Sequence, residues 1–110
     1  YGVQFQRNGQ PVLTYTGDTG WFPELAGLCA GSRYLLAEAS LREYEVAERG
    51  ANHMSARQAA QLAQSAGAEN LILTHFFPEN NLHQQQREAE QNYDGKIYMS
   101  GTGKKYILEP

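Results

Sequence analysis

The chain has 110 residues, of which 41% are hydrophobic and 19% are charged, and its net charge is −3. This composition fits one small globular domain or part of a larger one, and it excludes a disordered chain. The excess of acidic residues disfavours a surface that grips a long nucleic acid. No apolar run approaches the roughly 18–20 residues that a membrane helix needs, so we expect no membrane contact.

Cys29 is the single cysteine of the chain, so an internal disulfide is excluded. A lone thiol fits a reducing compartment, and we therefore expect a cytoplasmic protein. Because Cys29 lies between Leu28 and Ala30 in a predicted helix, buried packing is favoured over catalysis.

The first forty residues predict a hairpin followed by a strand-helix-strand unit. Weak alternation predicts a strand over Tyr1–Gln6, and Asn8-Gly9 is the strongest short signal for a hairpin turn. Pro11–Thr16 makes the return strand. A short helix is expected between Pro23 and Gly31. Residues 33–39 form a near-continuous apolar run, which is typical of a strand covered on both faces.

A surface loop or a frayed helix is expected over residues 41–50, which are charged and lack a clean period. Ser55 and Gln58 have the spacing of a capping box, so a helix is predicted to start at Ser55 and to stop at Gly67. Its inward face is nearly all alanine, which allows a helix to approach a sheet closely.

The remaining elements complete an α/β pattern. Leu71–Thr74 predicts a third buried strand, and residues 80–92 predict an amphipathic helix with Leu82 and Ala89 inward. Gly95–Met99 and Lys105–Leu108 predict two further strands. The alternation of strands and helices implies a mixed sheet with βαβ units.

Four side chains that could bind a metal ion or transfer a proton lie at the ends of these elements. Asp18 follows a strand in a Gly-Asp-Thr-Gly turn, Glu38 ends the next strand, His75 follows the third, and His53 precedes a helix. Because parallel strands end at the edge where the following helices begin, all four should gather along one rim. Asp and His suit zinc or a similar divalent ion, and a Glu near a His can form a proton-transfer pair.

Plainer explanations exist for each residue. Asp18 can cap the following turn, and His53 and His75 can be satisfied by local hydrogen bonds. Glu38 is harder to explain in this way, because a carboxylate at the end of an apolar strand needs a partner. His83 lies in the polar helix, and we expect it at the plain surface.

Four ordered motifs resemble the C-terminal half of a metallo-β-lactamase-fold hydrolase, in the ribonuclease Z and phosphodiesterase branch. They are Tyr15-Thr16-Gly17-Asp18-Thr19, Leu36-Ala37-Glu38-Ala39-Ser40, Asn52-His53-Met54-Ser55-Ala56 and Leu73-Thr74-His75-Phe76. The resemblance covers nearly the whole chain. It implies that residues 1–110 form half of an αββα sandwich, with the helices on one face of the sheet.

The resemblance also implies roles for the four residues. By match, Asp18 bridges two divalent metal ions, zinc in the first place, and His75 ligates one of them. Glu38 and His53 match the proton-donating pair of the ribonuclease Z branch. The implied activity is that of a dinuclear phosphodiesterase, in which a metal-bridging hydroxide attacks a phosphodiester substrate.

The family's main metal signature, His-x-His-x-Asp-His, does not occur in the 110 residues. We therefore expect the N-terminal half of the same fold as a partner, with a homodimer through the exposed apolar surface as a further option. Two ligands cannot complete a four-coordinate site, so the 110 residues alone are expected to be inactive and to bind metal weakly at best.

Two alternatives stay open. The first is a tRNA 3′-end processing endonuclease, which is ribonuclease Z itself. Ala37 stands where that branch often has a histidine, and Phe77-Pro78-Glu79 replaces its Ser-x-Arg-Tyr. These departures and the acidic balance disfavour nucleic acid as the substrate. The second alternative is a non-catalytic α/β module.

Overall fold

Five strands make up the sheet in this computed structural model, which describes residues 2–108. Along the sheet they lie in chain order: β1 (Val3–Arg7), β2 (Gln10–Tyr15), β3 (Tyr34–Glu38), β4 (Asn70–Thr74) and β5 (Lys96–Met99). β1 and β2 form the predicted antiparallel hairpin, and β2 to β5 run parallel. Tyr1, at the start of the first predicted strand, lies outside the described residues.

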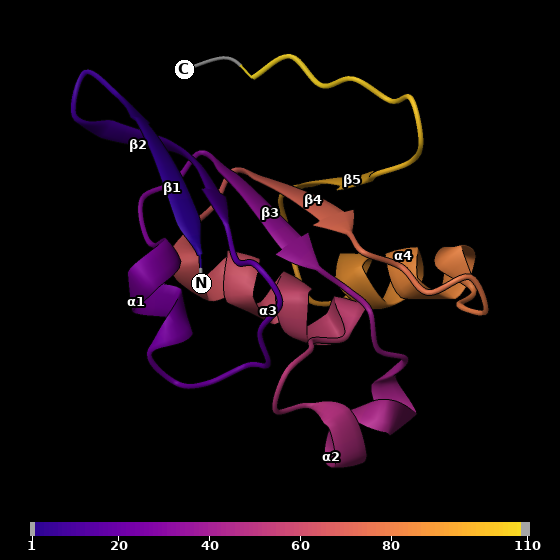
Figure 1. Cartoon of the computed structure of the whole chain (residues 1–110). Coiled ribbons are helices and arrows are strands. Elements are labelled where there is room, and N and C mark those ends of the chain that lie inside the picture. The colour runs from indigo at the N-terminus through magenta and orange to yellow at the C-terminus, as the bar shows by residue number, and fades with distance from the viewer. Residues whose placement is uncertain (1, 109–110) are drawn as a thin grey trace.

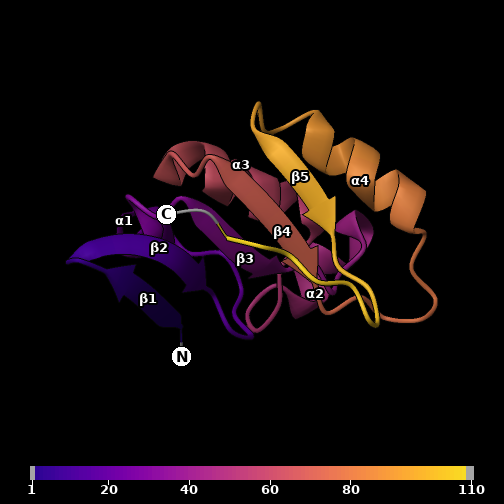
Figure 2. The same cartoon turned by 90° about the horizontal axis from the view of Figure 1, so that it is seen from above.

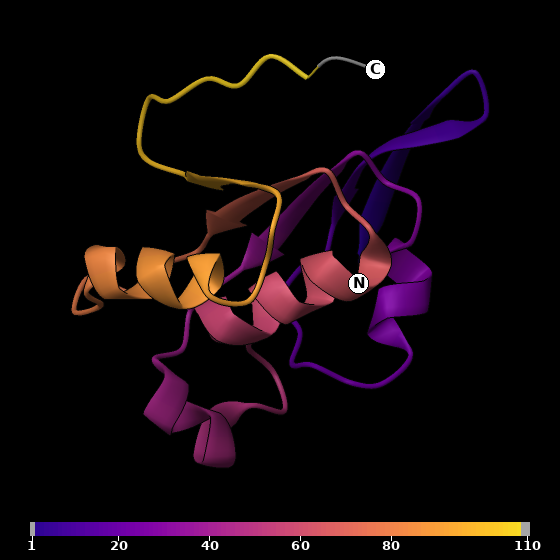
Figure 3. The same ribbon diagram turned by 180° about the vertical axis from the view of Figure 1, so that it is seen from behind.

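The helices follow the strands in alternation. They are α1 (Leu25–Cys29), the 3₁₀ helix η1 (Glu43–Glu45), α2 (Val46–Arg49), α3 (Ala56–Ala66) and α4 (Leu82–Glu90). α1, α3 and α4 lie on the same face of the sheet, and α2 lies farther from it (Figures 1 and 3). The predicted α/β fold, with a mixed sheet, βαβ units and helices on one face, is confirmed. Within residues 2–108, no helix is both long and apolar enough to cross a membrane.

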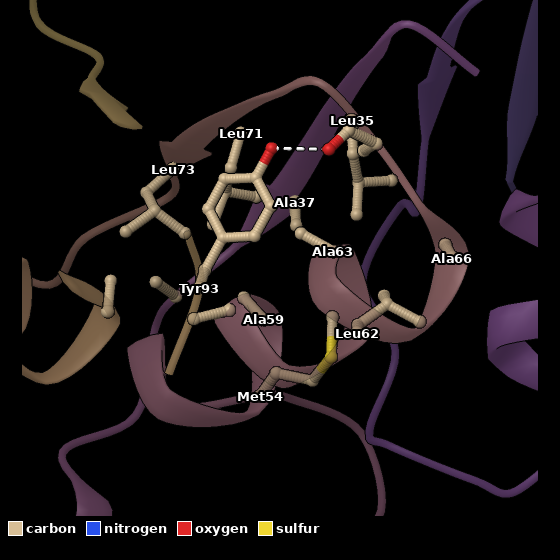
Figure 4. Packing of buried hydrophobic residues seen from close by; sticks show 14 of the residues in the cluster. Leu35, Ala37, Met54, Ala59, Leu62, Ala63, Ala66, Leu71, Leu73 and Tyr93 are labelled. Carbon is tan, nitrogen blue, oxygen red and sulfur yellow. Dashed lines mark hydrogen bonds between the residues drawn. The ribbon is translucent and has the colours of Figure 1, made fainter. Parts of the chain in front are cut away.

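α3 packs against the middle of the sheet as its alanine pattern predicts. The capping box is present: Gln58 N donates to Ser55 Oγ at 3.2 Å, and Ser55 N donates to Gln58 Oε1 at 3.1 Å. The helix ends at Gly67, whose φ of 72° suits glycine. Its buried alanines are Ala56, Ala59, Ala60, Ala63 and Ala66. Figure 4 shows this helix beneath leucines of β3 and β4.

α4 differs from the prediction in which side chains face inward. Leu82 was expected inside but is 43% exposed, and the polar Gln85 is buried instead. Ala89 is buried, as predicted. Gln85 enters because its Nε2 donates to the carbonyl of Ala39 at 2.9 Å, so a polar side chain satisfies a buried backbone group there. His83 is exposed, as expected.

The predicted strand over Lys105–Leu108 is wrong. Residues 101–108 instead run as an irregular segment over the face of the sheet opposite the helices (Figures 1 and 2). Side chains hold it there rather than a backbone ladder. Tyr106 packs edge-on against Tyr98, with ring centroids 5.6 Å apart, and its hydroxyl donates to Met99 O at 3.1 Å.

Apolar side chains also line this second face of the sheet. Strand register sets Phe5 opposite Leu13, and it sets Leu36 opposite Ile72. The side chain of Phe5 is 58% exposed. An apolar face of this kind on a sheet is typical of a surface that another element covers.

Tyr93 provides a test of the core between α4 and β5. It is buried, its hydroxyl donates to Ala68 O at 2.5 Å, and burial raises its pKa from 10.0 to about 12 (Figure 4). We expect Tyr93→Phe to lower the free energy of unfolding by about 1 kcal/mol near neutral pH, because a buried carbonyl loses its donor.

The pH dependence of this difference has a defined sign. In the unfolded protein Tyr93 ionises from about pH 10.0, whereas in the native protein its pKa is about 12. Between these values only the unfolded state gains from ionisation, so the wild-type protein loses stability as pH rises. The difference between wild type and Tyr93→Phe should therefore shrink over that range. Urea unfolding of both proteins at neutral and at alkaline pH measures it, and a constant difference would contradict the assignment.

Candidate metal centre

The candidate site stands at the carboxyl edge of the parallel strands. Asp18 lies just beyond β2, Glu38 is the last residue of β3, and His75 directly follows β4. His53 precedes α3, whose N-terminal end opens at the same edge. The structure brings all four of these side chains together, through the contacts described below.

Asp18 and His75 form the open part of the site. His75 Nδ1 lies 2.9 Å from Asp18 Oδ1, and the two side chains are 41% and 58% exposed, respectively. Gly17, with a φ of 67°, turns the chain after β2, and His75 itself has a φ of 63°. That left-handed conformation is uncommon for a residue with a side chain and costs energy. The contacts around His75 therefore hold its ring in place against local backbone preference.

Glu38 forms the closed part of the site. Its carboxylate is fully buried and accepts a hydrogen bond from the backbone N–H of Thr19 at 3.0 Å. The hydroxyl of Ser40 donates to Oε2. His53 Nδ1 lies 3.1 Å from both carboxylate oxygens. Because a carboxylate only accepts, Nδ1 of His53 carries the proton, and the ring has its Nε2 left for another partner.

The two carboxylates act together on the electrostatics of the rim. The pKa of Tyr15 is raised by burial first, and then by the negative charges of Asp18 and Glu38. Asp18 and Glu38 therefore create a negative potential at the end of β2. Such a potential favours a bound cation.

The donor chemistry of the site fits a divalent metal ion. Asp18, Glu38 and His75 each offer a ligand atom, and these atoms lie within 4.8 Å of one another. Carboxylate oxygen and imidazole nitrogen are ligands of zinc and similar ions. Glu38 is enclosed and already accepts from three donors, whereas Asp18 and His75 are open to solvent. These two residues are therefore the better ligands.

A close backbone contact joins the Asp18 turn to the segment before His53. A Cβ atom on Gly20 would lie 1.7 Å from Gly50 O and 2.8 Å from the carbonyl carbon of Ala51. Only glycine fits at position 20, so the loop that presents Asp18 packs directly on the loop that leads to His53.

Three contributors to the site were missed by the sequence reasoning. Thr19 acts through its backbone amide, which no residue type signals, and Ser40 has no sequence signal beyond its place in the motif Leu36-Ala37-Glu38-Ala39-Ser40. Phe77 is named above only within Phe77-Pro78-Glu79, as a departure from the ribonuclease Z pattern. Its ring centroid lies 6.2 Å from that of His53 and 6.0 Å from that of His75, with edge-to-face geometry. Its position two residues after His75 is the signal that could have found it.

Known proteins are similar to this chain in sequence and in fold. Residues 1–76 match the family described as the beta-lactamase superfamily domain. Uncharacterized protein ML1173 of Mycobacterium leprae is 29% identical over 110 residues, which are 99% of this chain and 38% of that protein. Ribonuclease Z of Brevibacillus brevis is 37% identical over 81 residues, which are 70% of this chain and 25% of that enzyme.

The crystal structure of the metallo-β-lactamase-fold protein YhfI from Bacillus subtilis superposes with a TM-score of 0.72 at 22% identity, covering 80% of this chain and 36% of YhfI. The chain thus spans between a quarter and two fifths of the length of these proteins. The resemblance drawn from the four motifs is confirmed. Because the family match takes in more than half of the residues, the chain belongs to the beta-lactamase superfamily domain family and has the metallo-β-lactamase fold.

Proposed function

We propose that the chain is part of a dinuclear zinc-dependent phosphodiesterase. In this proposal Asp18 and His75 are metal ligands, and Glu38 and His53 are the proton-donating pair. Membership of the family supports metal-dependent hydrolysis in general. The observation that carries the finer proposal is the hydrogen bond of His53 to a buried carboxylate, beside an open Asp–His pair.

The Glu38–His53 pair has the geometry of an oriented general acid. Glu38 fixes the ring by accepting from Nδ1, and its charge stabilises the protonated imidazole. The protonated ring donates from Nε2 to the leaving oxygen of the substrate while Nδ1 continues to donate to Glu38. Proton transfer of this kind contributes about 10²–10⁴-fold to a rate.

Asp18 and His75 would hold the metal ions. Divalent ions bound there would polarise phosphoryl oxygens and lower the pKa of a water molecule towards neutrality. Two ligands do not complete such a site, and we propose that the others come from the N-terminal half of the same fold. That half would cover the apolar sheet face of Phe5, Leu13 and Leu36, with a second copy of the chain as the alternative partner.

A ribonuclease Z activity is the second candidate, because several relatives carry that name. The same residues would serve it, since pre-tRNA is also a phosphodiester. A general phosphodiesterase is favoured here by the net charge of −3 and by Phe77-Pro78-Glu79 in place of Ser-x-Arg-Tyr.

Metal content tests the role of Asp18. We expect the full-length protein to bind about two zinc ions, and Asp18→Ala to retain about one or fewer, because in this proposal Asp18 would help to hold both ions. Asp94→Ala is the matched control, since Asp94 is exposed and hydrogen-bonded to Gln64 away from the site. Metal analysis after gel filtration gives the stoichiometry. Unchanged zinc in Asp18→Ala would refute the assignment, and a zinc-free wild type would favour the non-catalytic module.

Leaving-group dependence tests the role of His53. We expect His53→Ala to slow hydrolysis of a diester with an alkyl leaving group by about 10²–10⁴-fold. A p-nitrophenyl ester should lose much less, because p-nitrophenolate departs without a proton. The exposed His83→Ala is the control and should match wild type on both esters. Equal losses on the two esters would show that His53 is not the general acid.

Substrate choice separates the two enzyme candidates. We expect the full-length protein to hydrolyse bis(p-nitrophenyl) phosphate and to leave the 3′ trailer of a pre-tRNA uncut, for the reasons of charge and sequence given above. Product release is followed by absorbance in the first case and by gel electrophoresis in the second. Cleavage of pre-tRNA without turnover of the small diester would reverse the ranking.

A further inference from the structure

An arginine stands beside the ring that contacts both histidines of the site. The guanidinium carbon of Arg49 lies 5.4 Å from the centroid of the Phe77 ring, in a cation–π arrangement. The same ring contacts His53 and His75. Arg49 is the last residue of α2, four positions before His53, so the approach of α2 to the rim brings it there.

Glu45 holds Arg49 in this position without using up its donors. Arg49 Nη1 lies 3.2 Å from Glu45 Oε2. Glu45 Oε1 accepts from the backbone N–H of Arg42 at 2.9 Å and from its Nε at 3.0 Å. Hydrogen bonds from Arg42 lead the causes that lower the pKa of Glu45 to about 2, so this anchor stays ionised. Two guanidinium groups thus share the carboxylate of Glu45.

Arg49 has the donors that an anion needs. A guanidinium presents five N–H groups in a planar fork, and the contact to Glu45 engages one nitrogen. The side chain of Arg49 is 47% exposed, so it is accessible from solvent. Planar forks of this type bind phosphoryl oxygens in bidentate fashion. Arg49 therefore offers a fixed positive charge to a phosphodiester at the rim of the site.

We propose that Arg49 binds an anionic phosphoryl group of the substrate, with Phe77 as the platform that keeps the guanidinium beside His53 and His75. This inference rests on the proposed phosphodiesterase function and names a substrate-binding residue for it. Arg49 lies outside the four motifs that point to the metal ligands and the proton donor.

Phosphate affinity tests this proposal directly. Titration calorimetry of the zinc-loaded full-length protein with inorganic phosphate compares wild type, Arg49→Gln and Arg33→Gln. Arg33 is the matched control, because it is also a partly exposed arginine paired with a glutamate, Glu69, at 2.9 Å. We expect phosphate to bind about tenfold more weakly to Arg49→Gln, as for the loss of a charge-assisted hydrogen bond, and equally to Arg33→Gln and wild type.

The kinetic arm uses bis(p-nitrophenyl) phosphate. Arg49→Gln should raise KM by a similar factor and leave kcat within about twofold, because binding rather than proton transfer is lost. Equal phosphate affinity in wild type and Arg49→Gln, or no phosphate binding by wild type, overturns the proposal. Should Arg49→Gln melt at a lower temperature, Arg49→Lys decides: affinity above that of Arg49→Gln supports the proposal, and affinity no higher than that of Arg49→Gln, in a protein that melts like wild type, overturns it.

The two arms separate the proposals. If wild type hydrolyses the diester but Arg49→Gln binds phosphate as Arg33→Gln does, the role of Arg49 fails and the proposed function stands. If wild type does not hydrolyse the diester but Arg49→Gln alone loses phosphate affinity, the anion site stands and the proposed function fails.

Discussion

A carboxylate carried into the interior at the end of β3 must be met by donors, since burying an unpaired charge costs several kcal/mol. Glu38 meets this requirement with donors from three separate segments: the Thr19 amide after β2, the Ser40 hydroxyl after β3 and the His53 ring before α3. None of these segments can shift without uncovering the charge. The buried carboxylate therefore fixes the loops that build the site.

The segment around Ser40 is also held by residues that follow His75 in the chain. Asn80 Nδ2 donates to Ser40 O at 2.8 Å, and Gln85 Nε2 donates to Ala39 O at 2.9 Å. The side-chain oxygens of both amides are buried, and they have no partner among the described residues. An unsatisfied acceptor offsets much of what each hydrogen bond contributes. Their main effect is thus positional, because they tie the chain after β3 to the chain after β4.

The sequence was sufficient where residue type and element type coincide. Asp18, Glu38 and His75 lie at or just beyond the ends of apolar strands, and parallel strands bring such residues to one edge of the sheet. In the same way, Ser55 with Gln58 marked the start of α3. It was insufficient where tertiary contact overrides local pattern. The sequence pattern places Gln85 on the surface, whereas in the structure it is buried and donates to the carbonyl of Ala39.

Tertiary contacts also explain why the conformation of residues 105–108 and the position of Arg49 could not be predicted. Residues 105–108 follow a Gly-Thr-Gly turn and are mostly apolar, which predicted a strand, yet side chains such as Tyr106 on Tyr98 hold the segment rather than a backbone ladder. Arg49 lies in a charged stretch without a clean period, and only the packing of α2 reveals the ring it faces. Side-chain contacts between distant loops leave no periodic trace in a sequence.

The four residues of the site differ in burial, and this difference suits them to different roles. Glu38 is enclosed, and its oxygens are occupied by three donors, so it can orient a neighbour but has little room for an ion. Asp18 and His75 contact each other at the open end of the rim, where an ion could replace their mutual hydrogen bond. His53 is partly exposed and lies between these two parts of the site. It is hydrogen-bonded to the buried Glu38, and its ring lies edge-on to that of His75, with centroids 6.0 Å apart. A general acid needs one nitrogen held by a fixed partner and the other free for the substrate, and the proposed role of His53 fits this intermediate position.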